Sequence, residues 1–215
     1  MHLNFQEKPD AAMQQCASDF YQHVKSRRTV RDFSEKAIPQ GVLDDCILAA
    51  GTAPNGANLQ PWHFAVVTSQ ETKSKIRSAA EEEEKEFYGG RAPQEWLDTL
   101  SHLKTDEHKP FLEKAPALIA IFQKNKTVDE FGKERKCYYP KESVGIATGI
   151  LITALHNAGL ASLTHTPSPM GFLNDILDRP SSEKPYLLLV VGFPAENCEV
   201  PDISKLPIEK IRSVH

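Results

Sequence analysis

The densest group of positive charges in the sequence is the segment KSRRTVRDF. It contains Arg27, Arg28 and Arg31 within a few positions, with the hydroxyl group of Thr29 between them. If this segment leaves the end of a helix, the three guanidinium groups can converge on one anion. Their planar forks are suited to the oxygens of a phosphate group. A solvated surface patch explains a basic run of this size equally well, because such residues are mostly exposed in folded proteins.

A second candidate for chemistry is the acidic segment EEEEKEFY, residues 81–88. Glu84 and Tyr88 are separated by one helical turn, so a helix would place both side chains on the same face. Taken alone, however, a run of glutamates is more typical of a solvated helix face than of a binding site. The spacing therefore leaves both interpretations open.

Motifs for other kinds of chemistry are missing from the sequence. It has no HExxH motif, and His102 and His108 have no cysteines at ligand spacing, so the histidines favour surface or core positions over a metal site. It has no GxSxG elbow, and Ser143 and Cys137 have no base nearby in the sequence, so covalent catalysis is unsupported. GxGxxG and Walker A patterns are also absent, which argues against a tightly bound dinucleotide.

The composition is that of a water-soluble globular protein. A length of 215 residues allows one sizeable domain or two small ones. The formal net charge of -4 gives no general attraction to nucleic acid or to anionic lipid, so we expect neither as a partner. The sequence has neither a signal peptide pattern nor an apolar run of about 18 residues that could cross a membrane. Its four dispersed cysteines suit free thiols, and we expect a cytoplasmic protein.

Helical and strand-like segments alternate along the chain, which predicts an α+β fold with a central sheet. The sequence predicts helices at residues 11–26, 42–50, 70–88 and 141–158, of which 42–50 has a clear helical apolar period and 70–88 is polar, and a less well packed helical region at 93–114. Short apolar runs predict strands at residues 62–68, 116–123, 160–166 and 185–193. The segments 52–61 and 124–140 are predicted to be loops.

Two features indicate that the chain packs against a second copy. The predicted helix 141–158 is apolar on nearly every face between Val144 and Leu155, so we expect both of its sides to be covered. Gly145 and Gly149, one turn apart on this helix, would allow another backbone to approach closely, which a subunit interface or a central core position would each explain. The tail from residue 194 onward contains too few apolar residues to pack by itself, and we expect it to lie across a neighbour.

Several motifs resemble those of a known family. RRTVRDF followed by AAGTAPNGANLQPWHFAVV is similar to the opening of the nitroreductase superfamily, whose members are homodimers that hold FMN at the subunit interface. The segments IRSAAEEEEKEFY, THTP and VGFP extend the likeness to the iodotyrosine deiodinase branch, over about residues 20–210. The resemblance implies a single domain, 1–215, with a three-layer fold. In this fold helices flank a central mixed sheet, and a C-terminal extension, 194–215, wraps the dimer partner.

The resemblance also implies which residues bind FMN. The guanidinium groups of the basic segment would serve the phosphate and the pyrimidine side of the flavin, and Asn55 would reach the flavin of the partner subunit. Thr166 would offer its hydroxyl group to flavin N5 and so act as a catalytic residue. The cofactor-binding positions implied in this way are Arg27, Arg28, Thr29, Arg31, Asn55, Thr164, His165, Thr166 and Lys205.

For the substrate, the resemblance implies a halotyrosine. Glu84 would bind its ammonium group, Lys109 its carboxylate, and Tyr88 would add a hydrogen bond. The backbone N–H of Ala57 would donate to the phenolate oxygen, as an oxyanion donor does, which makes Ala57 the second catalytic position. Residues 84–109 would form a lid that substrate orders. The implied reaction is FMN-dependent reductive dehalogenation to tyrosine and halide.

The sequence leaves some alternatives open. The electron donor can be NAD(P)H or a separate reductase, and the halogen can be iodine, bromine or chlorine. The same scaffold also supports a broad-specificity nitro- or quinone reductase, and a flavin-binding protein without enzymatic activity is a further alternative. The discriminating feature is the trio Glu84, Tyr88 and Lys109, because a general nitroreductase has no use for a site that binds an amino acid zwitterion.

Overall fold

The computed structural model describes residues 2–100, 105–128 and 131–215. The longer helices are α1 (Asp10–Lys25), α2 (Val42–Gly51), α3 (Gln70–Glu86) and α6 (Pro140–Asn157). The shorter ones are α4 (Gln94–Leu100), α5 (Phe111–Lys114) and α7 (Phe172–Ile176). A π-helical turn, η2 (Phe87–Arg91), follows α3, and two 3-10 turns are η1 (Gly56–Asn58) and η4 (Ile208–Lys210). The strands are β1 (Trp62–Val67), β2 (Ala117–Lys124), β3 (Lys126–Val128), β4 (Glu134–Lys136), β5 (Ala161–His165) and β6 (Glu183–Gly192).

The central sheet has four strands in the order β1-β2-β6-β5, and every neighbouring pair is antiparallel. The prediction of a mixed sheet is therefore wrong for the described part of the chain. Parallel pairing there is limited to one isolated bridge between Thr29 and Ser162, because the basic segment touches β5 at that point only. One side of β1 has no strand partner among the described residues, so β1 is a free edge of the sheet.

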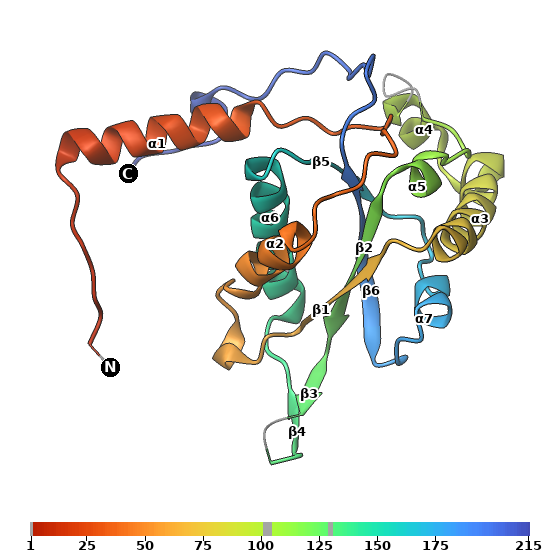
Figure 1. Ribbon diagram of the computed structural model, residues 1–215, viewed down its shortest axis with the longest axis horizontal. Coiled ribbons are helices and arrows are strands. Elements are labelled where there is room, and N and C mark those ends of the chain that lie inside the picture. Colours follow the sequence, from red (N-terminus) through yellow and green to blue (C-terminus); the bar gives the residue numbers. More distant parts are fainter. Residues whose placement is uncertain (1, 101–104, 129–130) are drawn as a thin grey trace.

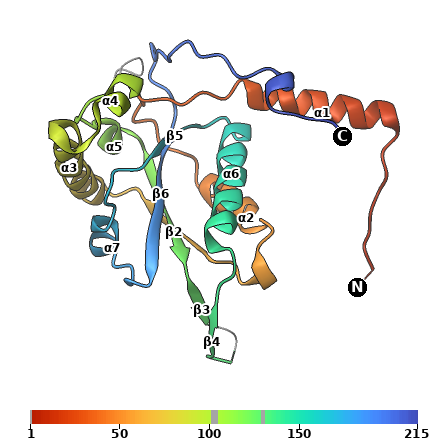
Figure 2. The same ribbon diagram turned by 180° about the vertical axis from the view of Figure 1, so that it is seen from behind.

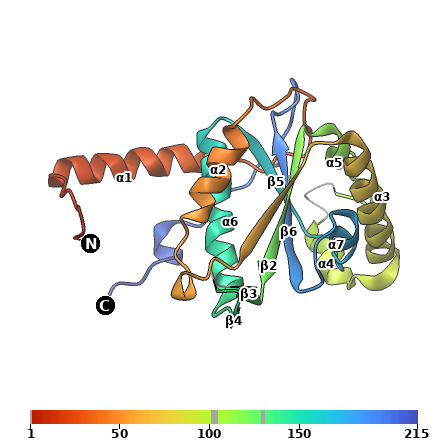
Figure 3. The same cartoon turned by 60° about the horizontal axis from the view of Figure 1, so that its bottom comes forward.

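Helices cover both faces of the sheet, which confirms the three-layer arrangement (Figure 3). Successive residues of β2 point to opposite faces, as the pleat of a strand requires. Leu118, Ala120 and Phe122 pack with α3, α5 and α7 in one core. Ile119 and Ile121 pack with α2 and α6 in the other. The continuous apolar run of β2 is thus explained by its burial on both sides.

Helix α6 is covered on one side only by its own chain. Its residues Val144, Ala147, Leu151 and Leu155 are buried against the sheet, whereas Ile146 on the opposite side is 46% exposed. A shallow hollow of about 660 Å³ runs over this outer face and is lined by apolar side chains that include Phe20 of α1. The described chain therefore leaves a second apolar surface on α6 open.

Helix α1 and the C-terminal tail extend away from the layered body (Figures 1 and 2). Among the described residues, α1 buries no side chain, and the tail runs to the same side of the molecule as α1. Apolar side chains of the tail, among them Leu206, Ile211 and Val214, are more than half exposed. The start of the tail packs against the core of the body through Cys198 and Val200, whereas α1 and the later apolar side chains of the tail obtain no hydrophobic core from this chain.

Three local differences from the sequence prediction concern short elements. The segment 124–140, predicted as a loop, contains the hairpin β3–β4, whose exposed three-residue strands have no apolar alternation to reveal them. Helix α7 was not predicted because it is only five residues long. The predicted helical region 93–114 is helical in α4 and α5, and its residues 101–104 lie outside the described residues.

Candidate active site

A cavity of about 220 Å³ lies between the end of α3, helix α4, the segment before α5 and the end of β5. These segments are far apart in the sequence, and the fold brings them together on the face of the sheet that α3 covers. Of the residues predicted to form the site, seven line this cavity: Arg31, Glu84, Tyr88, Lys109, Thr164, His165 and Thr166.

Glu84, Tyr88 and Lys109 contact one another in the cavity. The ammonium group of Lys109 lies 3.3 Å from a carboxylate oxygen of Glu84 and 5.4 Å from the centre of the Tyr88 ring. The side chains of Lys109 and Glu84 are only 3% and 14% exposed. An ion pair this well buried is sensitive to the loss of either partner, because the remaining charge would be left without compensation.

Lys109 is held in place through contacts on both its backbone and its side chain. Its N–H donates to the Glu81 carboxylate at 2.7 Å, and the same carboxylate accepts a bond from Arg77 at 2.8 Å. Its ammonium group also donates to the hydroxyl group of Thr105 and to the carbonyl of Asp106. The acidic run of α3 therefore positions the chain segment before α5 as well as lining the cavity.

Tyr88 lies in the π-helical turn η2, not in α3 itself as predicted. The helix ends at Glu86, and the wider turn that follows contains Gly90 at a φ of 140°, a backbone conformation that favours glycine. Glu84 and Tyr88 still line the same cavity. Turns of this kind often mark functional sites, because they change the direction in which a side chain points.

Burial controls the protonation of the two acidic groups in the cavity. Burial raises the pKa of Glu84, and the nearby Lys109 opposes this rise. Burial likewise raises the pKa of the Tyr88 hydroxyl, so that it stays protonated and can donate a hydrogen bond. The two groups thus present one acceptor, which is paired with Lys109, and one donor.

His165 ends β5 and is buried against the edge of the Phe111 ring, with the ring centres 5.6 Å apart. Burial, and to a lesser extent the charge of Lys109, lowers the pKa of His165 to about 3. Its Nε2 atom is buried and has no hydrogen-bond partner within the described residues. A buried polar atom of this kind is costly unless a ligand or water satisfies it.

The basic segment is only partly in the cavity. Arg31 lines it, whereas Arg27, Arg28 and Thr29 lie beside it and are not among its lining residues. Arg28 donates to the carbonyl of Pro201, which ties the segment to the C-terminal tail. The prediction that the three arginines converge on one anion remains a prediction.

Asn55, Ala57 and Lys205 are not brought to the cavity by the described chain. The loop between α2 and β1 lies in the layer of α2 and α6, across the sheet from α3 (Figures 1 and 3). Asn55 closes this loop by donating to the Ala53 carbonyl at 3.1 Å and accepting from the Gln60 N–H at 2.8 Å. Within one chain, the loop that carries Asn55 and Ala57 and the cavity lie on opposite faces of the sheet.

The backbone of the same loop is strained. Ala57 has φ 53° and ψ 25°, in the left-handed region that residues other than glycine rarely adopt. A Cβ atom on Gly56 would lie 2.6 Å from the carbonyl oxygen of Tyr138, so glycine is required there. Such conformations persist only where the surrounding structure enforces them, and they concentrate at functional sites.

Comparison with known proteins gives the family. The sequence profile of the Nitroreductase family matches residues 24–193, which is most of the chain. The chain belongs to the nitroreductase family. Within this family, an iodotyrosine deiodinase from Haliscomenobacter hydrossis is 53% identical over 189 residues, which are 88% of this chain and 85% of the relative. Iodotyrosine deiodinase 1 of Homo sapiens is 40% identical over 213 residues, 98% of this chain and 74% of the relative.

Solved structures of the nitroreductase family agree with this result. A crystal structure of oxidized iodotyrosine deiodinase bound to FMN and 3-iodo-L-tyrosine has a TM-score of 0.77 and 30% identity, and the match covers 88% of this chain and 97% of the other. A BluB-like flavoprotein from Clostridium difficile, at 20% identity and a TM-score of 0.68, shows the shared fold alone. The resemblance found in the sequence is confirmed, for the family and for its iodotyrosine deiodinase branch.

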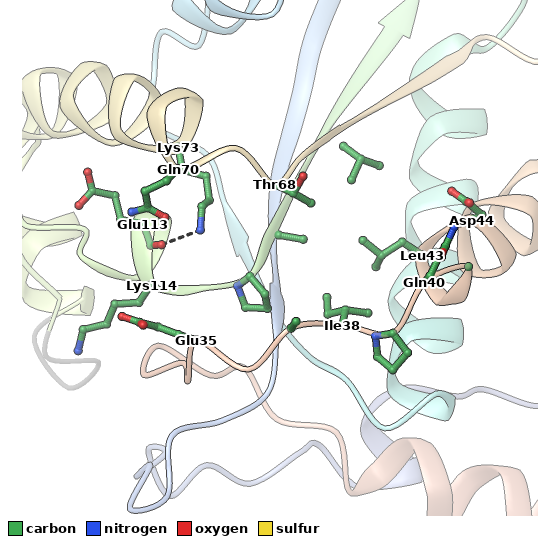
Figure 4. A pocket seen from close by; sticks show the side chains of 16 residues that line it. Glu35, Ile38, Gln40, Leu43, Asp44, Thr68, Gln70, Lys73, Glu113 and Lys114 are labelled. Atoms are coloured by element: carbon green, nitrogen blue, oxygen red, sulfur yellow. Dashed lines mark hydrogen bonds between the residues drawn. The ribbon is translucent and has the colours of Figure 1, made fainter.

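A second hollow, of about 660 Å³, is larger than the cavity of the candidate site and lies between α2, the end of β1 and the start of α3 (Figure 4). Its buried cation, Lys73, donates to the carbonyls of Glu113 and Ala115 at 2.8 Å each (Figure 4). None of the predicted site residues lines this hollow within the described part of the chain. We therefore assign the chemistry to the smaller cavity.

Several cavity residues were not identified from the sequence. Thr105 accepts from Lys109, Ser168 lines the cavity near the end of β5, and Phe87 lies edge-on to both Tyr88 and Trp96. The pair Gly89–Gly90 directly after Tyr88 was the available signal, because it breaks the helix at that point. Thr105 and Ser168 have no sequence signal of their own.

Three further observations concern the described residues as a whole. Among residues 2–100, 105–128 and 131–215, no group of three or more histidine, cysteine or acidic side chains is placed to hold a metal ion. No helix in the same ranges is long and apolar enough to cross a membrane. The four cysteines form no disulfide.

Proposed function

We propose that this chain is an FMN-dependent reductive dehalogenase that converts halotyrosines, such as mono- and diiodotyrosine, to tyrosine and halide. The observation that carries the proposal is the buried trio of Glu84, Lys109 and Tyr88 in the same cavity as Thr164, His165 and Thr166. The trio fits the zwitterion of an amino acid, and the cavity joins it to the segment that the family uses to bind FMN. The similarity to iodotyrosine deiodinases along most of the chain supports the same conclusion.

The trio binds the zwitterion by exchange of partners. In the absence of ligand, Glu84 and Lys109 neutralise each other at 3.3 Å. A substrate ammonium group takes the place of Lys109 beside Glu84, its carboxylate takes the place of Glu84 beside Lys109, and Tyr88 donates a hydrogen bond. Both buried charges stay compensated throughout, so the site avoids the large cost of an isolated buried charge. A neutral phenol has neither an ammonium nor a carboxylate group, so the ion pair between Glu84 and Lys109 stays intact.

The cavity also has the features that FMN binding requires. The orphaned Nε2 of buried His165, the hydroxyl groups of Thr164 and Thr166, and the guanidinium group of Arg31 all meet there. We assign the phosphate to Arg27, Arg28, Thr29 and Lys205 and the isoalloxazine ring to Arg31 and residues 164–166. Bound FMN, once reduced by NAD(P)H or by a separate reductase, supplies two electrons.

The remaining steps rest on the chain's own residues. The carbon–halogen bond breaks and the halogen leaves as halide with the bonding electron pair, while the two supplied electrons and one proton form the new C–H bond at the ring carbon. Thr166 would donate a hydrogen bond from its hydroxyl group toward flavin N5, and Tyr88 would orient the substrate. His165 stays neutral, because its pKa of about 3 is far below physiological pH, so it acts as a hydrogen-bonding partner and not as the proton source. Residues 84–109 act as a cover that excludes water; within this range α4 buries no side chain among its described residues.

The proposed enzyme is a homodimer, and the second copy completes each site. Asn55 and Ala57 lie across the sheet from the cavity of their own chain, so they can serve only the cavity of a partner. The backbone N–H of Ala57, presented by the strained loop, donates to the phenolate oxygen as an oxyanion donor does. The exposed apolar face of α6 and the projecting α1 supply the surface for the contact.

The C-terminal tail belongs to the same contact. Its exposed apolar side chains, including Ile203 and Leu206, have no core in their own chain. The free edge of β1, beside the larger hollow, offers unpaired backbone groups to an incoming segment. We propose that residues 194–215 of each chain lie on the partner, and that residues 1–215 form a single domain.

The test is Glu84→Gln in the FMN-loaded protein, with Glu82→Gln as the matched control. Glu82 lies on the same helix, but its side chain is 77% exposed and pairs only with Lys85. Iodide release from 3-iodotyrosine is measured anaerobically with dithionite as reductant, beside the reduction of a nitroaromatic compound. We expect kcat/KM for iodotyrosine to fall at least about 100-fold in Glu84→Gln, because Lys109 loses its partner and the ammonium loses its acceptor.

The same variant should reduce the nitroaromatic compound within about threefold of the parent protein, since that substrate has no zwitterion to bind. Glu82→Gln should leave both activities unchanged. Equal retention of both activities in Glu84→Gln would instead indicate a broad-specificity reductase. FMN that is reducible but passes electrons to neither acceptor would indicate a flavin-binding protein.

A further inference from the structure

Arg91 connects two parts of the cavity wall that are distant in the sequence. It is the last residue of the π-helical turn η2, and its guanidinium group lies 3.1 Å from the carboxylate of Glu83 and 3.2 Å from that of Glu86. The same group donates to the carbonyl of Glu83 at 3.0 Å and to the carbonyl of Ser168. One side chain therefore bridges the end of α3 and the segment that follows β5.

These two segments carry different parts of the proposed chemistry. Tyr88 lies inside η2, between Glu84 and Arg91 in the sequence, and Ser168 is two residues beyond Thr166. Gly89 and Gly90 separate Tyr88 from Arg91, and a glycine pair gives this turn little stiffness of its own. Within η2, the end of the turn is otherwise held by the bond from the Ala92 N–H to the Phe87 carbonyl. Arg91 thus holds the turn against the neighbouring segment.

Arg91 also ensures that two neighbouring carboxylates of the acidic run have different cationic partners. Glu83 and Glu84 both line the cavity, so either carboxylate could attract an ammonium group. Arg91 compensates Glu83, while Lys109 pairs with Glu84. Its planar fork allows it to serve two carboxylates and two carbonyls at once, which a lysine in its place cannot do with the same geometry.

We propose that Arg91 is a positioning residue that couples the zwitterion-binding trio to the segment carrying Thr166. When substrate orders Tyr88 and the turn, the bridge to Ser168 orders the segment that faces the flavin. By compensating Glu83, Arg91 also leaves Glu84 as the acceptor for the substrate ammonium. This inference rests on the proposed function, because it assigns a role to Arg91 within that site.

The experiment measures order directly in the FMN-loaded protein. Hydrogen–deuterium exchange is followed in peptides covering residues 84–91 and 164–170, with and without 3-iodotyrosine. The dissociation constant of the ligand is measured in parallel from the change in flavin absorbance. The variants are Arg91→Gln and Arg91→Lys. The matched control is Arg179→Gln, which removes an arginine that contacts Glu183 with two nitrogens at 2.8 Å, away from the cavity.

In the parent protein we expect the ligand to slow exchange in both peptides. In Arg91→Gln the ligand should no longer protect residues 164–170, and its dissociation constant should rise about tenfold, since Glu83 then competes with Glu84. In Arg91→Lys the dissociation constant should stay within about threefold, because the charge remains, while protection of 164–170 is still lost. This split between affinity and protection would not follow from a merely structural role.

Full ligand protection of residues 164–170 in Arg91→Gln would overturn the inference and leave the proposed function intact. Loss of that protection in Arg179→Gln as well would also overturn it, because the effect would then be a general loss of stability. If iodotyrosine causes neither a flavin absorbance change nor protection from exchange in the parent protein, the proposed function itself is wrong. The coupling through Arg91 is then also wrong, because it rests on that function.

Discussion

At the scale of single residues, the central feature is that Glu84 and Lys109 satisfy each other before any ligand arrives. A site with two separate free charges would attract many ions, whereas in the proposed site this pair would open only for a molecule that replaces both partners. The expected selectivity is therefore for amino acids over simple phenols. Because the pair is buried, the discrimination should be large and should depend little on salt.

His165 gives the protein a specific pH dependence. Its pKa is about 3 in the folded chain and near the ordinary 6.5 in the unfolded chain, so the unfolded state binds more protons below pH 6.5. The associated stability is fully present above pH 6.5 and is lost as the pH falls toward 3. We expect the flavin-free protein to lose about 2 kcal/mol of unfolding free energy from this group between pH 7 and pH 5.

Urea denaturation at the two pH values checks this prediction, with His165→Gln and the control His108→Gln. The first variant should lose that part of the pH dependence. The second should retain it, because the ring of His108 is 65% exposed. An unchanged pH dependence in His165→Gln would show that the His165 ring takes up a proton as readily in the folded protein as in the unfolded chain.

The sequence predicted the site residues to different degrees. Glu84 and Tyr88 could be placed on one face from their helical spacing, and resemblance added Lys109, which the structure brings to them. Asn55 and Ala57 could be named but not placed, because their position relative to the cavity depends on how two chains associate. Arg91 was not identified, since its role depends on a bridge to Ser168 that sequence spacing does not reveal.

At the scale of elements, the loop between α2 and β1 depends on close contact at Gly56. An added Cβ atom would meet the carbonyl oxygen of Tyr138 at 2.6 Å, and neither backbone can move freely. We expect Gly56→Ala to lower the free energy of unfolding by about 1–3 kcal/mol and to displace Ala57, which reduces halotyrosine turnover.

Chemical denaturation and iodide release test this prediction, with Gly51→Ala as the control. Gly51 lies at the end of α2, and an added Cβ atom there meets nothing within 4 Å. The free energy of unfolding of Gly51→Ala should equal or slightly exceed that of the parent protein, because alanine lowers the conformational entropy of the unfolded chain. A Gly56→Ala protein as stable and active as the parent would mean that the loop shape is not constrained.

The elements themselves were predictable where the pattern was long and periodic. Helices α1, α2 and α6 and the four strands of the central sheet occur where the apolar spacing placed them. The hairpin β3–β4 and helix α7 were missed because short polar or isolated elements carry no periodic signal. The mixed sheet that the resemblance implied is not found among the described strands, and their apolar patterns could not have corrected it, because such a pattern does not specify whether a neighbour is parallel or antiparallel.

At the scale of the whole molecule, the open face of α6 is the testable part of the proposed dimer. Ile146 lies on this face and is 46% exposed in the single chain. We expect Ile146→Glu to raise the dimer dissociation constant at least about 100-fold, because it would bury an uncompensated carboxylate. The variant should also lose FMN, because each monomer lacks the partner's Asn55 and Ala57.

Light scattering coupled to gel filtration and the flavin absorbance of the eluted protein check this prediction. Lys75→Glu on α3, in the opposite layer, is the control and should remain dimeric and yellow. A monomeric Ile146→Glu protein that retains full FMN and full turnover would contradict the shared site.

In the proposed homodimer, the position of the strained Ala57 loop across the sheet from the cavity of its own chain has a genetic consequence. A chain with an inactivating substitution at Glu84 still has an intact loop. A chain with an inactivating substitution in the loop still has an intact cavity. When the two are expressed together, a mixed pair contains one intact centre and one that is doubly defective. Random assortment then restores about a quarter of the normal centres from two inactive parents. Complementation between alleles of one gene is therefore an expected outcome of the proposed homodimer.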